Sequence, residues 1–171
     1  RTDLEFFLGD IRNASAVIDA VSRYDAVFNL AGILGTSETL NNSRPSININ
    51  VGGAINVFDA CRLHKKKCVQ ILTGHWRWNN TYAITKYTTE RFALMYNHEF
   101  GTEIAMVMAM NVYGPGQHWK SVRKAVPVFI VNALQNKPIE IYGTGQQFVN
   151  LIYVEDVAKI LTKAMGCGIY D

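Results

Sequence analysis

The 171-residue sequence has few cysteines, no long apolar run and little charge of either sign. Its three cysteines, Cys61, Cys68 and Cys167, include no Cys-x-x-Cys pair. A small, odd number argues against a disulfide framework and predicts free thiols, some of them buried, in a reducing compartment such as the cytoplasm. No apolar run approaches the ~20 residues that a membrane-spanning helix needs, and the first residues lack the pattern of a secretory signal. We therefore expect no membrane segment.

The charge is spread along the chain and is close to balanced. The net charge is +3, hydrophobic residues make up 49% of the chain and charged residues 18%, which is typical of a soluble globular protein. The one dense basic run covers residues 65–67. It comes with no nucleic-acid-reading motif and no interleaved aromatic residues, so we expect a solvated loop and no nucleic-acid partner.

What the sequence does contain is an alternation of strand-like and helix-like segments. Short apolar runs predict strands, and apolar residues three and four apart predict helices. The expected strands cover residues 4–8, 25–31, 68–73, 103–110, 139–142 and 148–153. The expected helices cover residues 13–21, 45–64, 83–100, 122–134 and 154–165.

Details within two of these helices add to the prediction. Gly52 and Gly53 lie inside the second expected helix, where each glycine costs about 1 kcal/mol relative to alanine, so we expect close packing there. The expected helix 83–100 ends at Gly101, a typical C-cap. Its apolar and long side chains recur three and four residues apart at Ala83, Tyr87, Arg91, Leu94 and Met95.

The alternation predicts an α/β fold, a Rossmann-like doubly wound parallel sheet with helices on both faces. Ligands of such sheets bind at the carboxyl ends of the strands. Asp10, Gly32, Thr73 and Asn111 each follow an expected strand, so we expect them along one edge. The character of the chain changes near Asn111, which predicts a Rossmann-like part over residues 1–110. Residues 111–171 are expected to form part of a small substrate lobe, with elements that return to the sheet.

Tyr82 and Lys86 lie four residues apart at the start of the expected helix 83–100, on one helical face. A lysine ammonium beside a phenol would lower the pKa of that phenol. Such a tyrosine can exchange a proton with a hydroxyl or carbonyl that is exchanging a hydride. The spacing alone is also typical of an exposed helical pair without chemistry. The strand that ends at Thr73, just before this helix, favours an active site.

The sequence resembles a known family at these residues. Residues 82–86, Tyr-Ala-Ile-Thr-Lys, are similar to the Tyr-x-x-x-Lys motif of the extended short-chain dehydrogenase/reductases, and most of all to their NAD-dependent epimerase/dehydratase branch, which acts on nucleotide sugars. The resemblance runs through nearly the whole chain, and residues 111–116, Asn-Val-Tyr-Gly-Pro-Gly, carry its most specific match. Further similar segments are residues 9–13, 29–32, 50–53, 142–145 and 152–157.

This resemblance implies NAD as the cofactor, a nucleotide sugar as the substrate, no metal, and a homodimer formed through the helices 45–64 and 83–100. It implies that Tyr82 is the acid/base, that Lys86 tunes Tyr82 and holds the ribose, and that Thr73 orients the substrate hydroxyl. The cofactor contacts that it implies are Asp10, Ile11, Leu30, Ala31, Gly32, Asn50, Tyr82 and Lys86. The substrate contacts that it implies are Thr73, Asn111, Val126 and Tyr142.

The chain also departs from the family pattern. It has no Gly-x-x-Gly-x-x-Gly loop for the pyrophosphate, and only eight residues separate Thr73 from Tyr82. Met108 and Val149 stand where many members carry an arginine. Because the chain also begins without Met and ends before the rest of the family's substrate lobe, we expect an incomplete copy of such an enzyme.

Two of these departures leave open how the ligand is held. Residues 75–78, His-Trp-Arg-Trp, are interpreted as a solvated loop or as a platform on which a sugar or base stacks, and His75 is either an acid or without a role. Lys120, Arg123 and Lys124 are either surface residues or substitutes for the missing arginines.

The leading hypothesis is therefore an NAD-dependent epimerase, or a related dehydratase or reductase, that acts on a nucleotide sugar through transient oxidation. Family dehydratases usually carry acidic residues directly after the Thr, and Gly74 with His75 here favours epimerisation. One alternative is a non-catalytic, truncated or degenerate Rossmann domain. Another is a carbonyl reductase of a non-nucleotide substrate. The sugar, the carbon that reacts and the choice between NAD and NADP stay open.

Overall fold

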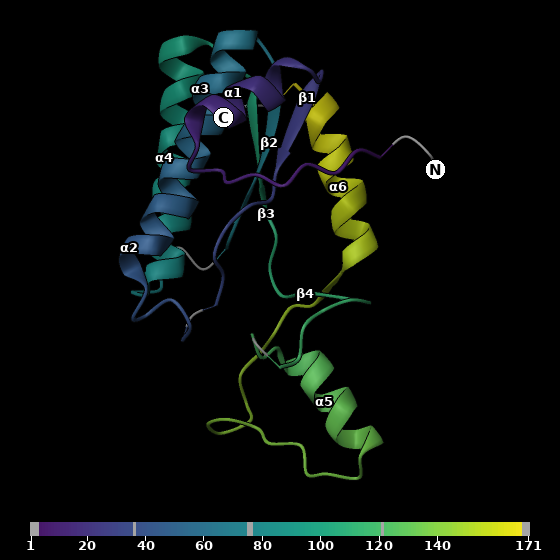
Figure 1. The fold of residues 1–171 in the computed structure, drawn as a ribbon. Coiled ribbons are helices and arrows are strands. Elements are labelled where there is room, and N and C mark those ends of the chain that lie inside the picture. Colours follow the sequence, from purple (N-terminus) through teal and green to yellow (C-terminus); the bar gives the residue numbers. More distant parts are fainter. Residues whose placement is uncertain (1–3, 36, 75–76, 121, 169–171) are drawn as a thin grey trace.

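The computed structural model describes residues 4–35, 37–74, 77–120 and 122–168 (Figure 1). Its main sheet has three parallel strands in the order β1-β2-β3, namely β1 (Ala26–Asn29), β2 (Lys67–Leu72) and β3 (Ile104–Met108). A second, smaller parallel pair joins β4 (Val112–Tyr113) to β5 (Ile152–Tyr153). The predicted parallel α/β sheet is thus confirmed.

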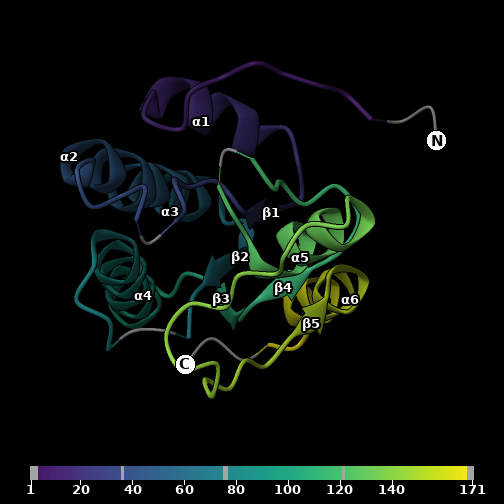
Figure 2. The same ribbon diagram turned by 90° about the horizontal axis from the view of Figure 1, so that it is seen from below.

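Helices cover both faces of the main sheet. Helices α3 (Gly53–His64) and α4 (Thr81–Phe100) lie on one face, with α1 (Ala14–Ser22) packed against α3. Helix α6 (Val154–Gly166) lies on the other face, against β2 and β3 (Figures 1 and 2). Because α6 comes late in the chain and still packs on this sheet, the chain returns to the Rossmann-like part after leaving it at β4.

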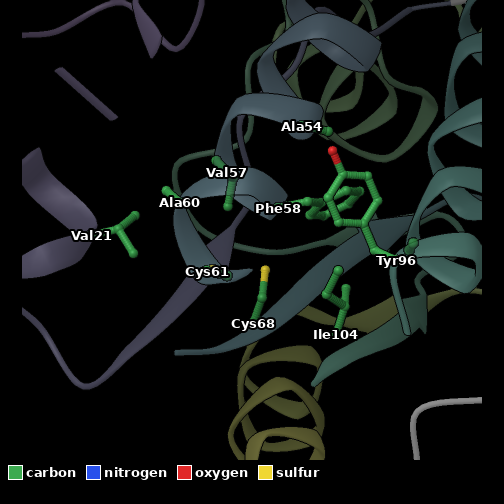
Figure 3. Packing of buried hydrophobic residues seen from close by; sticks show 10 residues of the cluster. Val21, Ala54, Val57, Phe58, Ala60, Cys61, Cys68, Tyr96 and Ile104 are labelled. Atoms are coloured by element: carbon green, nitrogen blue, oxygen red, sulfur yellow. The ribbon is translucent and has the colours of Figure 1, made fainter. Parts of the chain in front are cut away.

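Each face of the sheet has its own apolar core, because successive side chains of a strand point to opposite faces. Cys68 and Ile104 point into the core under α3 and α4, which also contains the fully buried Phe58 (Figure 3). The neighbouring residues Val69 and Ala105 point into the core under α6. A strand buried on both faces is a continuous apolar run, which is why the sequence revealed β2 and β3 clearly.

Capping residues fix the ends of the predicted helices. Asn13 caps α1 by accepting a hydrogen bond from the backbone N–H of Ala16 at 3.2 Å. Asn80 caps α4 in the same way, and Gly101 ends it in a left-handed conformation. These ends place Tyr82 in the first turn of α4.

The expected single helix over residues 45–64 is instead three joined segments. A short helix α2 (Ser43–Ser46) leads into a π-helix, η1 (Ile47–Gly52), which continues as α3. The close packing expected at the two glycines is found at Gly53, where an added Cβ would lie 2.6 Å from the side chain of Ile11.

Two predicted strands are wrong, and a third is shorter than predicted. Residues 4–8 form no strand, and Phe6 and Leu8 are fully or almost fully exposed, since no described strand pairs with this segment. Residues 139–142 also lack a pairing strand and remain exposed. Of residues 148–153, only β5 is a strand, because only that end reaches β4. The helix expected from residue 122 begins later, as α5 (Ala125–Leu134).

Candidate active site

A cleft of about 460 Å³ opens at the carboxyl end of the main sheet. Gly32, Thr73 and Asn111, which follow β1, β2 and β3, all line it, as the predicted edge position requires. Tyr82 and Lys86 reach the same cleft from the first turns of α4. The structure therefore brings together the three residues predicted to be catalytic.

Lys86 lies almost entirely inside the protein, with 5% of the residue exposed. Its Nζ donates a hydrogen bond to the carbonyl oxygen of Ile71 at 3.2 Å. Burial lowers the pKa of Lys86 to about 8, because a charged ammonium loses hydration there. Among the described residues, no carboxylate forms an ion pair with it, so the charge faces the cleft without an anionic partner.

The pKa of Tyr82 differs from the sequence-based expectation. A hydrogen bond with Thr73 lowers the pKa of the Tyr82 phenol, but burial acts more strongly and leaves the pKa above its ordinary value. The expected lowering by Lys86 is absent, since Lys86 is not among the groups that shift the phenol and its Nζ points to Ile71. Tyr82 is therefore a neutral proton donor at pH 7.

Gly32 lets the loop after β1 approach the end of the Lys86 side chain. A Cβ at this position would lie 3.0 Å from Oδ1 of Asn50 and 3.5 Å from Nζ of Lys86. Any larger residue would fill the space above the ammonium. The glycine thus keeps Lys86 accessible from the cleft.

Asn50 fastens this loop to α4 and does not line the cleft itself. Its Oδ1 accepts a hydrogen bond from the backbone N–H of Ile33 at 2.7 Å, and its Nδ2 donates to the Ile33 carbonyl at 3.0 Å and to Oγ1 of Thr85 at 3.0 Å. The π-helix presents the Asn50 carbonyl to Thr89, whose hydroxyl donates to it at 2.9 Å. Sequence reasoning missed Thr85 and Thr89, because their partner Asn50 lies 35 and 39 residues away along the chain.

Of the predicted cofactor residues Leu30, Ala31, Asp10 and Ile11, only Leu30 lines the cleft. Leu30 lines the cleft, whereas its neighbour Ala31 does not and donates its N–H to the side chain of Asn29 at 3.3 Å. Asp10 also lies outside the cleft lining, where its hydrogen bonds with Arg12 hold the pKa of the carboxyl at about 2. Ile11 packs against Gly53. Their contacts with a cofactor stay predictions.

The predicted substrate residues Tyr142 and Val126 line two smaller cavities beyond the cleft. Tyr142 borders a cavity of about 260 Å³ together with Phe129, and Val126 borders one of about 80 Å³ together with Val149. Lys124 borders both of these and the main cleft. Of the three basic residues considered from the sequence, Lys124 is thus the one that lies where the cavities meet.

The short segment between Thr73 and Tyr82 reaches the cleft through Trp78, which is about half exposed. His75 and Trp76, included in the stacking hypothesis, lie outside the described residues. Gly74 packs closely under Met110, and a Cβ there would come within 2.4 Å of the Met110 sulfur. A side chain at position 74 would therefore require the flexible Met110 side chain to move.

The described residues contain neither a candidate metal site nor a candidate membrane-spanning helix. No group of His, Cys, Asp and Glu there has the arrangement of a metal site. Among the described helices, none combines the length and the apolar character that crossing a membrane requires.

Comparison with known proteins agrees with the resemblance seen in the sequence. The sequence model of the NAD dependent epimerase/dehydratase family matches residues 1–167. A UDP-N-acetyl-alpha-D-glucosaminuronate decarboxylase of Bacillus cytotoxicus is 29% identical over 91% of this chain and 54% of its own length. A CDP-paratose 2-epimerase of Salmonella typhi is 24% identical over 96% of this chain and 60% of its own length. The chain thus spans little more than half the length of these relatives.

Solved structures share the fold. The UDP-glucose 4-epimerase of Thermotoga maritima, solved with UDP-glucose, superposes with a TM-score of 0.91 at 21% identity, covering 96% of this chain and 60% of that one. The WbmF enzyme of Bordetella bronchiseptica, solved with NAD+, superposes with a TM-score of 0.90 at 22% identity, covering 99% of this chain and 57% of that one.

Proposed function

Because the chain belongs to the NAD dependent epimerase/dehydratase family, we propose that it carries the catalytic residues of an NAD-dependent enzyme that epimerises a nucleotide sugar through transient oxidation. The observation that supports this most directly is the meeting of three residues at one cleft. Tyr82 hydrogen-bonds with Thr73, and Lys86 lies one helical turn further along α4. The relatives named above act on nucleotide sugars, which supports the substrate class.

Each of the three residues has a distinct role in this proposal. Tyr82 holds the proton that passes to and from the sugar oxygen, Thr73 orients that oxygen through its hydroxyl, and the Lys86 ammonium brings positive charge to the cleft one helical turn away. Bound NAD would accept the hydride and return it. Because burial keeps the Tyr82 phenol protonated, Tyr82 can donate its proton in the reductive half of the reaction. In the oxidative half the phenol must accept a proton as a phenolate, and additional positive charge in the cleft is needed to stabilise that phenolate.

The cleft suits the nicotinamide and ribose end of NAD. Gly32 leaves open space above the buried Lys86, whose ammonium can donate to ribose hydroxyls. Leu30 adds an apolar wall for the ring. We propose that these residues, with Tyr82, hold this half of the cofactor.

The residue after Thr73 favours epimerisation over dehydration. Dehydratases of the family usually carry an acidic side chain directly after the threonine, whereas Gly74 here has no side chain. Loss of water from the sugar would lack that acid. We propose that the keto sugar is instead reduced again from its other face.

Lys124 is proposed to hold the diphosphate of the substrate. It lies where the main cleft meets the cavities lined by Tyr142 and Val126, so one ammonium can reach a group that spans them. Val149, at the position of a family arginine, borders one of these cavities without a charge. Lysine can replace arginine here as a point charge, although it lacks the bidentate geometry.

The test is turnover of a panel of nucleotide sugars by the full-length protein, followed by NMR of the sugar. We expect one UDP-, GDP-, CDP- or dTDP-sugar to be epimerised, and Tyr82→Phe to reduce kcat by about 10²–10⁴-fold with the fold retained. Tyr87→Phe is the matched control, because Tyr87 lies on the exposed side of the same helix.

Other outcomes point to the alternatives. Turnover of simple ketones but of no nucleotide sugar would indicate a carbonyl reductase. Failure of the full-length protein to bind NAD(H) at all, measured by nicotinamide fluorescence, would indicate a non-catalytic domain.

We further propose that the protein is a homodimer that associates through α3 and α4. Large apolar residues are exposed on these helices at Leu63, Ile84 and Met95. In the proposed dimer these side chains would be buried between the two copies. Light scattering should give twice the chain mass, and Ile84→Glu should give the monomer. A monomeric wild-type protein at micromolar concentration would contradict the dimer.

A further inference from the structure

The cavity of about 260 Å³ beside Tyr142 is built by α5 and by the chain that turns back after it (Figure 1). At this turn Asn136 has the left-handed conformation, with φ at 52°. The N–H of Lys137 donates back to the carbonyl of Asn132 at 2.8 Å. The chain therefore reverses at the end of α5, and residues 140–142 line the cavity together with that helix.

Two side-chain amides of the cavity lining are held by backbone carbonyls. Nδ2 of Asn132 donates to the carbonyl of Pro138 at 3.2 Å, and Nε2 of Gln147 donates to the carbonyl of Tyr142 at 2.7 Å. Because a carbonyl oxygen can only accept, each amide must turn its nitrogen toward the backbone. In the described part of the chain neither amide oxygen has a partner, so both are available to a ligand as acceptors.

Glu140 adds a carboxylate to the same lining. The residue is exposed, and among the described residues no basic side chain forms an ion pair with it. An ionised carboxylate has two acceptor oxygens and no donor. Together with the two amide oxygens, Glu140 therefore makes this part of the cavity rich in acceptors.

The positive charges of the lining lie at the start of α5. Arg123 and Lys124 precede the helix, and Asn132 lies eight residues after Lys124, which is a rise of about 12 Å along a helix. This length suits a nucleoside whose phosphates lie beside the basic residues and whose base lies beside the acceptors. Phe129 and Tyr142 also line the cavity and supply aromatic rings against which a base can pack.

We propose that this cavity selects guanine, so that the substrate is a GDP-sugar; the inference rests on the proposed turnover of a nucleotide sugar. Guanine carries a ring N–H beside an exocyclic amino group, which supplies adjacent donors to the two oxygens of the Glu140 carboxylate. Uracil and thymine place their one N–H between two carbonyl acceptors. Cytosine and adenine place an amino group beside a ring acceptor, so each of these four bases would turn an acceptor toward an acceptor.

The test measures the binding of nucleoside diphosphates to the full-length protein by isothermal titration calorimetry with NAD present. We expect GDP to bind about 10-fold or more tightly than UDP, CDP, dTDP or ADP, since only guanine satisfies the carboxylate with two donors. IDP lacks only the amino group of guanine, and we expect it to bind several-fold more weakly than GDP.

Glu140→Gln keeps the size of the side chain and removes its charge. It should lower the affinity for GDP by about 10-fold and leave the affinities for UDP and NAD unchanged, because only guanine uses the carboxylate. Glu155→Gln is the matched control, since Glu155 is exposed on α6 and lies outside the lining of this cavity. The control should bind GDP as the wild-type protein does.

Several outcomes would overturn the assignment of guanine. These are a UDP, CDP, dTDP or ADP affinity that equals that of GDP, an IDP affinity that equals that of GDP, and a GDP affinity that Glu140→Gln leaves unchanged. Preferred turnover of a UDP-, CDP- or dTDP-sugar would also overturn it and would leave the proposed epimerisation intact. Selective binding of GDP without turnover of any nucleotide sugar would support the guanine site and contradict the proposed reaction.

Discussion

At the scale of single residues, Lys86 shows how burial sets the charge that the cleft presents. Its pKa of about 8 lies below the ordinary value of 10.5, so the ammonium is charged at neutral pH only at a cost in hydration. The Ile71 carbonyl, which accepts the hydrogen bond of Lys86, also receives one from Gln70 at 2.9 Å. Removing Lys86 therefore leaves no buried carbonyl without a donor.

Replacing Lys86 with methionine should stabilise the fold at pH 7 by about 1–3 kcal/mol, since it removes a buried charge. Between pH 8 and 10.5 the unfolded wild-type chain holds a proton that the folded chain has lost, so wild-type stability rises with pH in this window relative to the variant. Urea unfolding at pH 7 and at pH 9.5 measures both values. A stability difference that stays constant, or widens, as the pH rises would contradict this account.

At the scale of elements, the π-helix and the helix that follows it join the loop after β1 to α4. The Asn50 carbonyl of this π-helix accepts a hydrogen bond from the hydroxyl of Thr89 in α4 at 2.9 Å. Gly53, in the first turn of α3, brings this helix against Ile11. Gly52, one position earlier, has no such neighbour.

The adjacent glycines provide a matched pair of substitutions. Gly53→Ala should destabilise the fold by about 1–3 kcal/mol, because its Cβ would overlap the branched side chain of Ile11. Gly52→Ala should be neutral or stabilising by up to about 1 kcal/mol, because its Cβ meets only the Ile47 carbonyl at 3.9 Å and alanine favours a helix. Thermal or urea unfolding of the two variants compares them directly. Equal effects would show that the contact with Ile11 does not restrict position 53.

The same elements show what the sequence could and could not predict. Periodicity located α4 and Gly101 marked its C-terminal end, but Tyr87 and Met95 of the predicted stripe are exposed. The buried side of α4 includes the predicted Ala83, and it also carries the polar residues Thr85, Lys86 and Thr89. A polar face becomes buried only because partners on η1 and β2 satisfy its hydrogen bonds, and those partners lie far away in the sequence. Periodicity, which depends on residue type alone, contains no such information.

At the scale of the whole molecule, the parallel sheet made the cleft predictable. Three strands that run the same way bring Gly32, Thr73 and Asn111 to one edge, and local signals were enough to find those strands. The predicted strand at residues 4–8 failed for the opposite reason. Its apolar run resembles β2, but a strand is stable only with a neighbour, and no described strand pairs with it.

The distribution of burial predicts where the chain opens first. Helix α5 has no buried residue, whereas α6, which comes later in the chain, buries Val157 and Leu161 against the sheet. Local opening is easiest where few apolar contacts are lost. In hydrogen exchange, amides of α5 should therefore exchange about 10-fold or more faster than those of α6. Equal protection of the two helices without a ligand would show that burial in this chain does not set the order of opening.

A nucleotide sugar that binds Lys124 and the cavity beside Tyr142 should slow hydrogen exchange in α5 and leave exchange in α6 unchanged, because α5 borders that cavity and α6 does not.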